Sequence, residues 1–232
     1  MISPARLNVS AETWETLWSY LHRILVLNLG ITVTSLPLLG ALTLVAQPWQ
    51  YPVFFAALTV CLGPALAAAF GYLAATDNHN RNTITEYARA YRRHALPAAA
   101  RWTVTVAVLG VLVTDIGLLH DSPAGAPLVP MLAVLLVLVL VAGLISLALL
   151  PLRPELTLWR ALATAAVASV RRWPLSLISL AALGAAAITV NQAPLLGLAT
   201  VPGCAIILTW TNTRASIGDP GPAPAPPASQ RH

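Results

Sequence analysis

Residues 128–150 read LVPMLAVLLVLVLVAGLISLALL and contain no charged side chain. A helix of this length crosses the hydrocarbon core of a bilayer, which needs about 20 apolar residues. Further apolar runs of similar character lie on either side of it, so the sequence predicts six transmembrane helices. The other five runs are Ile24–Ala46, Tyr51–Ala75, Trp102–Leu119, Leu175–Val190 and Pro194–Trp210.

The composition excludes an ordinary soluble domain. Of the 232 residues, 57% are hydrophobic and only 9% are charged, whereas about a quarter are charged in a typical soluble domain. The longest polar interval, Thr76–Ala100, is too short for a separate soluble domain. We therefore predict an all-α membrane protein with one membrane domain at 24–212. A cytoplasmic segment at 1–23 precedes it, and a disordered Pro/Ala-rich cytoplasmic tail at 213–232 follows it.

The distribution of positive charge orients these spans. All thirteen basic residues are arginines, and none lies in the turns Gln47–Gln50, His120–Pro127 and Asn191–Ala193. Arginines near span ends stay on the cytoplasmic face. The spans are thus predicted to pair as three hairpins in the plasma membrane, with both termini cytoplasmic. The net charge of +5 does not indicate nucleic-acid binding, because the arginines flank apolar spans. We expect them to contact anionic lipid headgroups.

Amphipathic helices are predicted at the inner membrane surface within Met1–Arg23, Thr83–Ala95 and Glu155–Val170. Thr83 and Glu86 have the spacing of a capping box, and Pro97 is expected to end the helix that they start. These interfacial helices carry aromatic and basic side chains that suit contact with lipid or a partner protein. The candidates are Tyr87, Tyr91, Arg92, Arg93, Trp159, Arg171 and Arg172.

Polar residues inside the predicted spans are candidates for function. Asn28, Thr32 and Ser35 share one face of the first span, and Pro37 should kink it. This polar stripe is expected to face the bundle, where it either lines a solute path or joins helices. Asp115 is a candidate because carboxylates within the membrane are costly. It also lies close enough to the predicted outer boundary to be solvated.

Other patterns indicate packing rather than chemistry. The four-residue spacing of Gly63, Ala67 and Gly71 predicts a close approach of the second span to a neighbouring helix. Cys61 and Cys204 lie within apolar runs and are expected to pack there. No recognisable pattern predicts a catalytic, metal or cofactor site, so we expect a protein that is not an enzyme and binds no cofactor.

Five short motifs follow one another in a characteristic order. They are RILVLNL at Arg23–Leu29, SLP at Ser35–Pro37, GPALAAA at Gly63–Ala69, TEYARAYRR at Thr85–Arg93, and LTLWRAL at Leu156–Leu162 leading to RRWP at Arg171–Pro174. In this order they resemble the YesL-like family (DUF624) of bacterial integral membrane proteins, over about Trp14 to Trp210. Members of that family are suspected of assisting carbohydrate uptake by ABC transporters.

The resemblance implies a non-catalytic accessory component of carbohydrate or solute uptake. Its expected partners are ABC transporter subunits and a second copy of this chain. The alternative is a small solute permease that uses the polar stripe and Asp115. The chain is less suited to be the ABC permease itself, since Glu155–Val170 lacks the Glu-Ala-Ala…Gly pattern of coupling loops. An intramembrane enzyme has no supporting motif.

Overall fold

The computed structural model describes residues 11–47, 50–79, 84–120, 122, 125–171, 173–192 and 194–217. Their regular secondary structure is helical throughout. The helices are α1 (Ala11–Thr34), α2 (Leu36–Leu44), α3 (Pro52–Thr59), α4 (Leu62–His79), α5 (Ile84–Leu119), α6 (Gly125–Leu152), α7 (Leu158–Arg171), α8 (Trp173–Gln192) and α9 (Pro194–Ile217).

Several of these helices are long and apolar enough to cross a membrane. In the described residues three helical stretches qualify, namely Pro52–Asp77, Ile84–Leu119 and Pro127–Leu152. A fourth is present if Leu17–Thr34 and Leu36–Leu44, which meet at 62°, form one bent span. The predicted all-helical fold with membrane-length apolar helices is thereby confirmed. The count of six spans, and their pairing as three hairpins, stay predictions.

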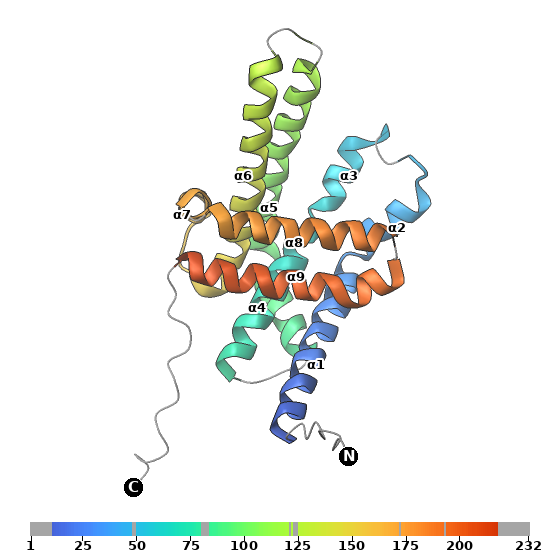
Figure 1. Ribbon diagram of the computed structural model, residues 1–232, viewed down its shortest axis with the longest axis vertical. Helices are drawn as coiled ribbons and strands as arrows, with labels where there is room; N and C mark the ends of the chain where they lie inside the picture. The colour runs from blue at the N-terminus through green and yellow to red at the C-terminus, as the bar shows by residue number, and fades with distance from the viewer. Residues whose placement is uncertain are drawn as a thin grey trace, which may run out of the picture.

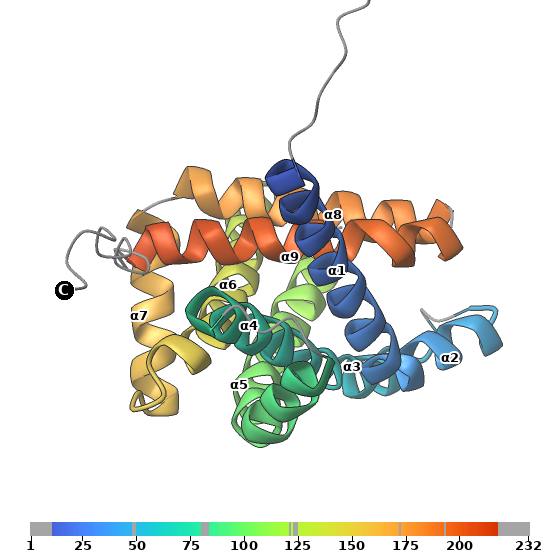
Figure 2. The same ribbon diagram turned by 90° about the horizontal axis from the view of Figure 1, so that it is seen from below.

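The helices form two sets that cross one another. In Figure 1, α5 and α6 lie side by side and extend beyond the rest of the molecule, while α8 and α9 lie side by side across them. Figure 2 shows the molecule from below, with α1 crossing the α8–α9 pair, α4 beside the pair and α7 at one end of it. The main core lies where α1, α4, α9 and the packed parts of α5 and α6 meet. It includes Leu27, Phe70, Tyr72, Leu147 and Trp210.

Glycine lets α4 and α6 approach α5 closely. A Cβ atom added to Gly63 would lie 2.5 Å from Cβ of Trp102, and one added to Gly143 would lie 2.5 Å from Cγ2 of Thr105. A larger residue at either position would force the neighbouring side chain or the helices to shift. The predicted small-residue face of the second span is confirmed, because Ala67 is buried and Gly71 packs against Ala90.

The first predicted span bends where its sequence predicts. α1 ends at Thr34, and α2 begins at Leu36 with Pro37 in its first turn. Proline is accepted there because the N–H groups of a first turn have no intrahelical partner. Upstream of the bend, α1 runs without interruption from Ala11, so the domain boundary predicted between residues 23 and 24 falls inside this helix.

Pro97 does not end a helix, contrary to the prediction. α5 runs through Pro97 and is 36 residues long in all. The predicted interfacial helix and the third span therefore form one element. An interior proline loses one backbone hydrogen bond and crowds the preceding turn, but Ala98, Arg101 and Trp102 are buried directly after it. Their packing keeps the chain helical. The predicted capping residue Thr83 lies outside the described residues.

The helix α7 covers most of the amphipathic helix predicted at Glu155–Val170, and its place at the membrane surface stays a prediction. Ala161, Ala165 and Ser169 form its buried side. Trp159 and Val170 face outward, with 72% and 60% of their surface exposed. Small side chains thus hold α7 against the protein and leave a large apolar surface facing away from it.

Candidate functional site

The polar stripe of α1 is used mainly for helix packing. Oδ1 of the buried Asn28 accepts a hydrogen bond of 2.6 Å from the backbone N–H of Gly203 in α9. Thr32 is half-buried, and Ser35 is buried at the bend between α1 and α2. The Ser35 hydroxyl makes no hydrogen bond within the part of the chain that the structure describes. Asn28 therefore joins two helices.

Asp115 lies far from this stripe. The hydroxyl oxygens of Thr34, at the end of α1, and Tyr87, near the start of α5, are 3.3 Å apart. Asp115 follows Tyr87 by 28 residues on the same helix, which corresponds to about 42 Å along its axis. It is half-buried near the α5–α6 turn, at the end of the pair that extends away from the other helices (Figure 1). The structure does not bring Asp115 and the stripe together.

The residues predicted to contact lipid or a partner divide into two groups. Tyr87 is buried, and its hydroxyl donates a hydrogen bond of 3.1 Å to the carbonyl oxygen of Ala65. Tyr91 is half-buried and packs against the main core. These two tyrosines hold helices together. The exposed group comprises Arg92, Arg93, Trp159 and Arg171, while Arg172 lies outside the described residues.

A charge cluster that the sequence did not predict joins the middle of α1 to the C-terminal parts of α4 and α9. Asp77 Oδ2 accepts hydrogen bonds from Arg214 Nη1 at 3.0 Å and from Trp210 Nε1 at 3.1 Å. Nη1 of Arg23 lies 3.8 Å from Asp77 Oδ1. We call these four residues the Asp77 cluster. The available sequence signal was a carboxylate directly after an apolar run, with arginines at the ends of two other runs.

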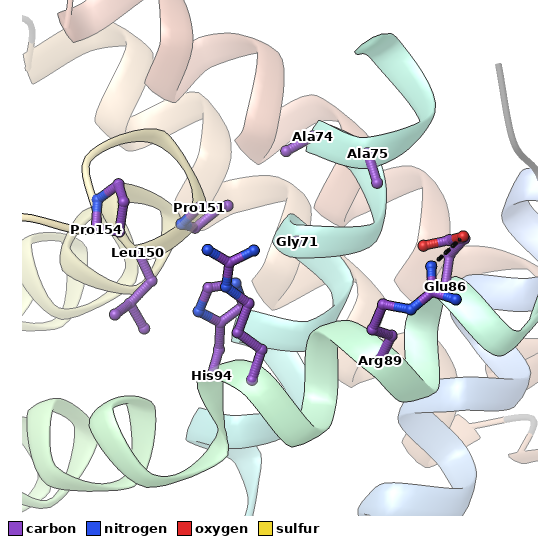
Figure 3. Close-up of a pocket in the computed structure, with 10 residues that line it drawn as sticks. Gly71, Ala74, Ala75, Glu86, Arg89, His94, Leu150, Pro151 and Pro154 are labelled. Atoms are coloured by element: carbon purple, nitrogen blue, oxygen red, sulfur yellow. Dashed lines mark hydrogen bonds and ion pairs between the residues drawn. The ribbon is translucent and has the colours of Figure 1, made fainter. Parts of the chain in front are cut away.

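A cleft opens between the end of α4, the first half of α5 and the turn that follows α6 (Figure 3). It has a volume of about 320 Å³. A neighbouring cleft of about 400 Å³ shares four of its residues, so we treat the two as one basic groove. The shared residues are Arg93, His94, Leu150 and Pro154; the first cleft adds Gly71, Ala74, Ala75, Glu86, Arg89 and Pro151, and the second adds Pro97, Ala100, Arg101, Leu156 and Leu158.

Two ends of the basic groove differ in how their arginines are held. At one end Nη1 of Arg89 lies 2.5 Å from Glu86 Oε1, and Figure 3 marks this ion pair with a dashed line. At the other end Arg101 is only 4% exposed. Its Nη1 donates to the carbonyl oxygen of Ser146 at 2.8 Å, and its Nη2 donates to that of Leu156 at 3.0 Å. Arg101 thereby ties α5 to α6 and to the turn before α7.

The chemistry available in this groove is anion binding. Three arginines and one glutamate line it, and His94 lies between the two ends. Among the residues that the structure describes, no group of three or more His, Cys, Asp or Glu side chains could hold a metal ion. Guanidinium groups present planar sets of N–H donors that suit carboxylate and phosphate oxygens.

No protein-family model, curated protein or solved structure matches this chain.

Proposed function

We propose that the protein is a non-catalytic accessory component of a solute uptake system in the bacterial plasma membrane. Its apolar helices hold it in the bilayer, and its arginine-rich end faces the cytoplasm. The link to carbohydrate uptake by ABC transporters rests on the ordered motifs that resemble the YesL-like family. The cytoplasmic orientation rests on the absence of arginine from the three short turns.

One observation favours this accessory role over transport of a solute by the chain itself. Asn28, the buried amide of the polar stripe, bonds to the backbone of Gly203 and is therefore occupied. The carboxylate that a permease would place beside it, Asp115, lies about 42 Å further along α5 than the point where α1 meets that helix. The buried amide of the stripe therefore joins α1 to α9, as expected of a protein that supports a partner.

The exposed face of α7 is the surface that we assign to the partner. Trp159, Val167 and Val170 project from it, and Arg171 lies at its end. A transporter subunit in the same membrane would cover the apolar side chains and meet the arginine at the membrane surface. Aromatic and arginine side chains are the residues that contribute most to protein interfaces.

Mild crosslinking in native membranes followed by purification tests the accessory role. We expect a transporter subunit to co-purify with the unaltered protein. Trp159→Ala should reduce its recovery, whereas the control Val111→Ala, on the exposed surface of α5 near the outer end, should not. Recovery of only lipid and self-oligomer would reject the proposal.

A small permease is the second candidate, favoured by the buried Ser35 hydroxyl. Within the described residues this hydroxyl has no hydrogen-bond partner, and it lies at the bend of a span, where a solute path could pass. Proteoliposomes that contain only this protein distinguish the two functions. A permease supports solute flux that Asp115→Asn abolishes, whereas the accessory role predicts no intrinsic flux.

A further inference from the structure

The buried guanidinium of Arg101 lacks a counter-charge. Its hydrogen bonds to Ser146 and Leu156 reach carbonyl oxygens, which are neutral. No carboxylate forms an ion pair with it anywhere in the described ranges of the chain. Removing a charged group from water is costly, and carbonyl oxygens compensate only part of that cost. An anion seated beside Arg101 would supply the missing charge.

The basic groove brings a second arginine to the same place. Arg93 and Arg101 both line its second cleft. Arg93 makes no hydrogen bond or ion pair with any residue that the structure describes, so its guanidinium remains available. Arg89 differs, because it already forms an ion pair with Glu86. The end of the groove near Arg93 and Arg101 is therefore the cationic end.

Apolar side chains lie directly beside these two arginines. Pro97, Leu150, Leu156 and Leu158 line the same cleft of about 400 Å³. A small inorganic anion would use the arginines and leave this apolar wall in contact with water. An amphiphile would use both, because its charged group and its hydrocarbon chain are joined.

We propose that the basic groove binds the phosphate group of an anionic phospholipid, held by Arg93 and Arg101, with the start of the acyl chains against the apolar wall. This goes beyond the accessory role and does not depend on it. It also differs from general attraction to anionic membranes, in which every surface arginine contributes similarly. In the groove Arg93 matters, whereas its neighbour Arg92, exposed and outside the groove lining, does not.

Native mass spectrometry of the purified full chain tests this with two lipids that share acyl chains, phosphatidylglycerol and phosphatidylcholine. The unaltered protein should retain phosphatidylglycerol preferentially. Arg93→Gln should weaken its binding about fivefold, since one arginine near a lipid phosphate contributes about 1 kcal/mol. Arg92→Gln removes the same charge from the adjacent residue and should change binding less than about twofold. Equal losses in both variants would overturn the proposal.

Arg101→Gln should weaken binding at least as strongly, but it also removes the hydrogen bonds to Ser146 and Leu156. The comparison of Arg93 with Arg92 therefore decides, because both side chains are exposed and their loss leaves the core intact. Inorganic phosphate is then added as a competitor and should displace phosphatidylglycerol poorly. If it binds as tightly as the lipid, the groove is a site for free phosphate and the assignment to a phospholipid is wrong.

Discussion

The two halves of the α5–α6 pair differ in composition and in packing. In the inner half, at 84–105 and 141–152, Leu144, Leu147 and Trp102 are buried against other helices. In the outer half, at 106–119 and 125–140, Leu112 is the one large apolar side chain among the described residues that is buried, and others are well exposed, Val134 at 61% and Leu118 at 75%. Small and polar residues mark the inner half, whereas the outer half is mostly Val and Leu. Hydropathy therefore predicts where a helix meets the bilayer, and small residues predict where helices meet each other.

The largest expected contrast between the halves is in chemical labelling from outside the cell. In a background with Cys61→Ala and Cys204→Ala, Ser122→Cys places a thiol in the outer turn and Glu155→Cys places one beyond the inner half. A membrane-impermeant maleimide should label the first in intact cells and the second only after lysis, because the predicted topology separates them. Labelling of both in intact cells would contradict that topology.

Overpacking should affect the inner half far more than the outer half. Gly63→Val inserts atoms where even a Cβ would lie 2.5 Å from Trp102, so we expect a loss of about 3 kcal/mol in the free energy of unfolding. Gly110→Val is the matched control, since nothing lies within 4 Å of an added Cβ there. It should change stability by less than about 0.5 kcal/mol. Titration with a denaturing detergent in mixed micelles measures both, and equal effects would remove the distinction.

Neutralising a carboxylate should destabilise the packed core more than the outer half of the α5–α6 pair. Asp77→Asn breaks two ion pairs whose arginine side chains are only 18% and 19% exposed. We expect a loss of about 2 kcal/mol, between the values for exposed and fully buried pairs. Asp115→Asn in the outer half should cost less than about 0.5 kcal/mol. The same unfolding titration tests the pair, and a larger loss at Asp115 would show that it has a structural partner.

The smallest effect is expected from the link between α1 and α9. Asn28→Ala removes the acceptor of the Gly203 N–H, and side-chain hydrogen bonds between membrane helices contribute about 1 kcal/mol. Thr114→Ala is the control, because the exposed Thr114 hydroxyl bonds only to the carbonyl of Gly110 in its own helix. Its unfolding free energy should stay close to that of the unaltered protein. If Asn28→Ala leaves the free energy of unfolding unchanged, the contact is dispensable.

Several features within single helices could be predicted from the sequence, although Pro97 was wrongly expected to end one. The apolar runs predicted membrane-length helices, the spacing of Gly63, Ala67 and Gly71 predicted a packed face, and Pro37 predicted a bend. Each depends on residues a few positions apart, where helix geometry fixes the relation.

Features that join distant helices could not be predicted in this way. Arg214 lies 137 residues from Asp77, and Arg101 lies 55 residues from Leu156. A pattern on one helix indicates which face is polar but not which helix will cover it. Tyr87 shows the same difficulty, because its place in an amphipathic pattern suggested the surface, and α1 and α4 bury it. The groove was missed since its walls come from α4, α5, α6, the turn after α6 and the start of α7.

The unbroken length of α5 has a mechanical consequence. Its 36 residues extend for about 54 Å, whereas the hydrocarbon core of a bilayer is about 30 Å thick. The basic groove lies along one end and the α5–α6 turn follows the other. A perpendicular crossing uses only part of this length, so the rest of α5 has to extend beyond the hydrocarbon core unless the helix tilts.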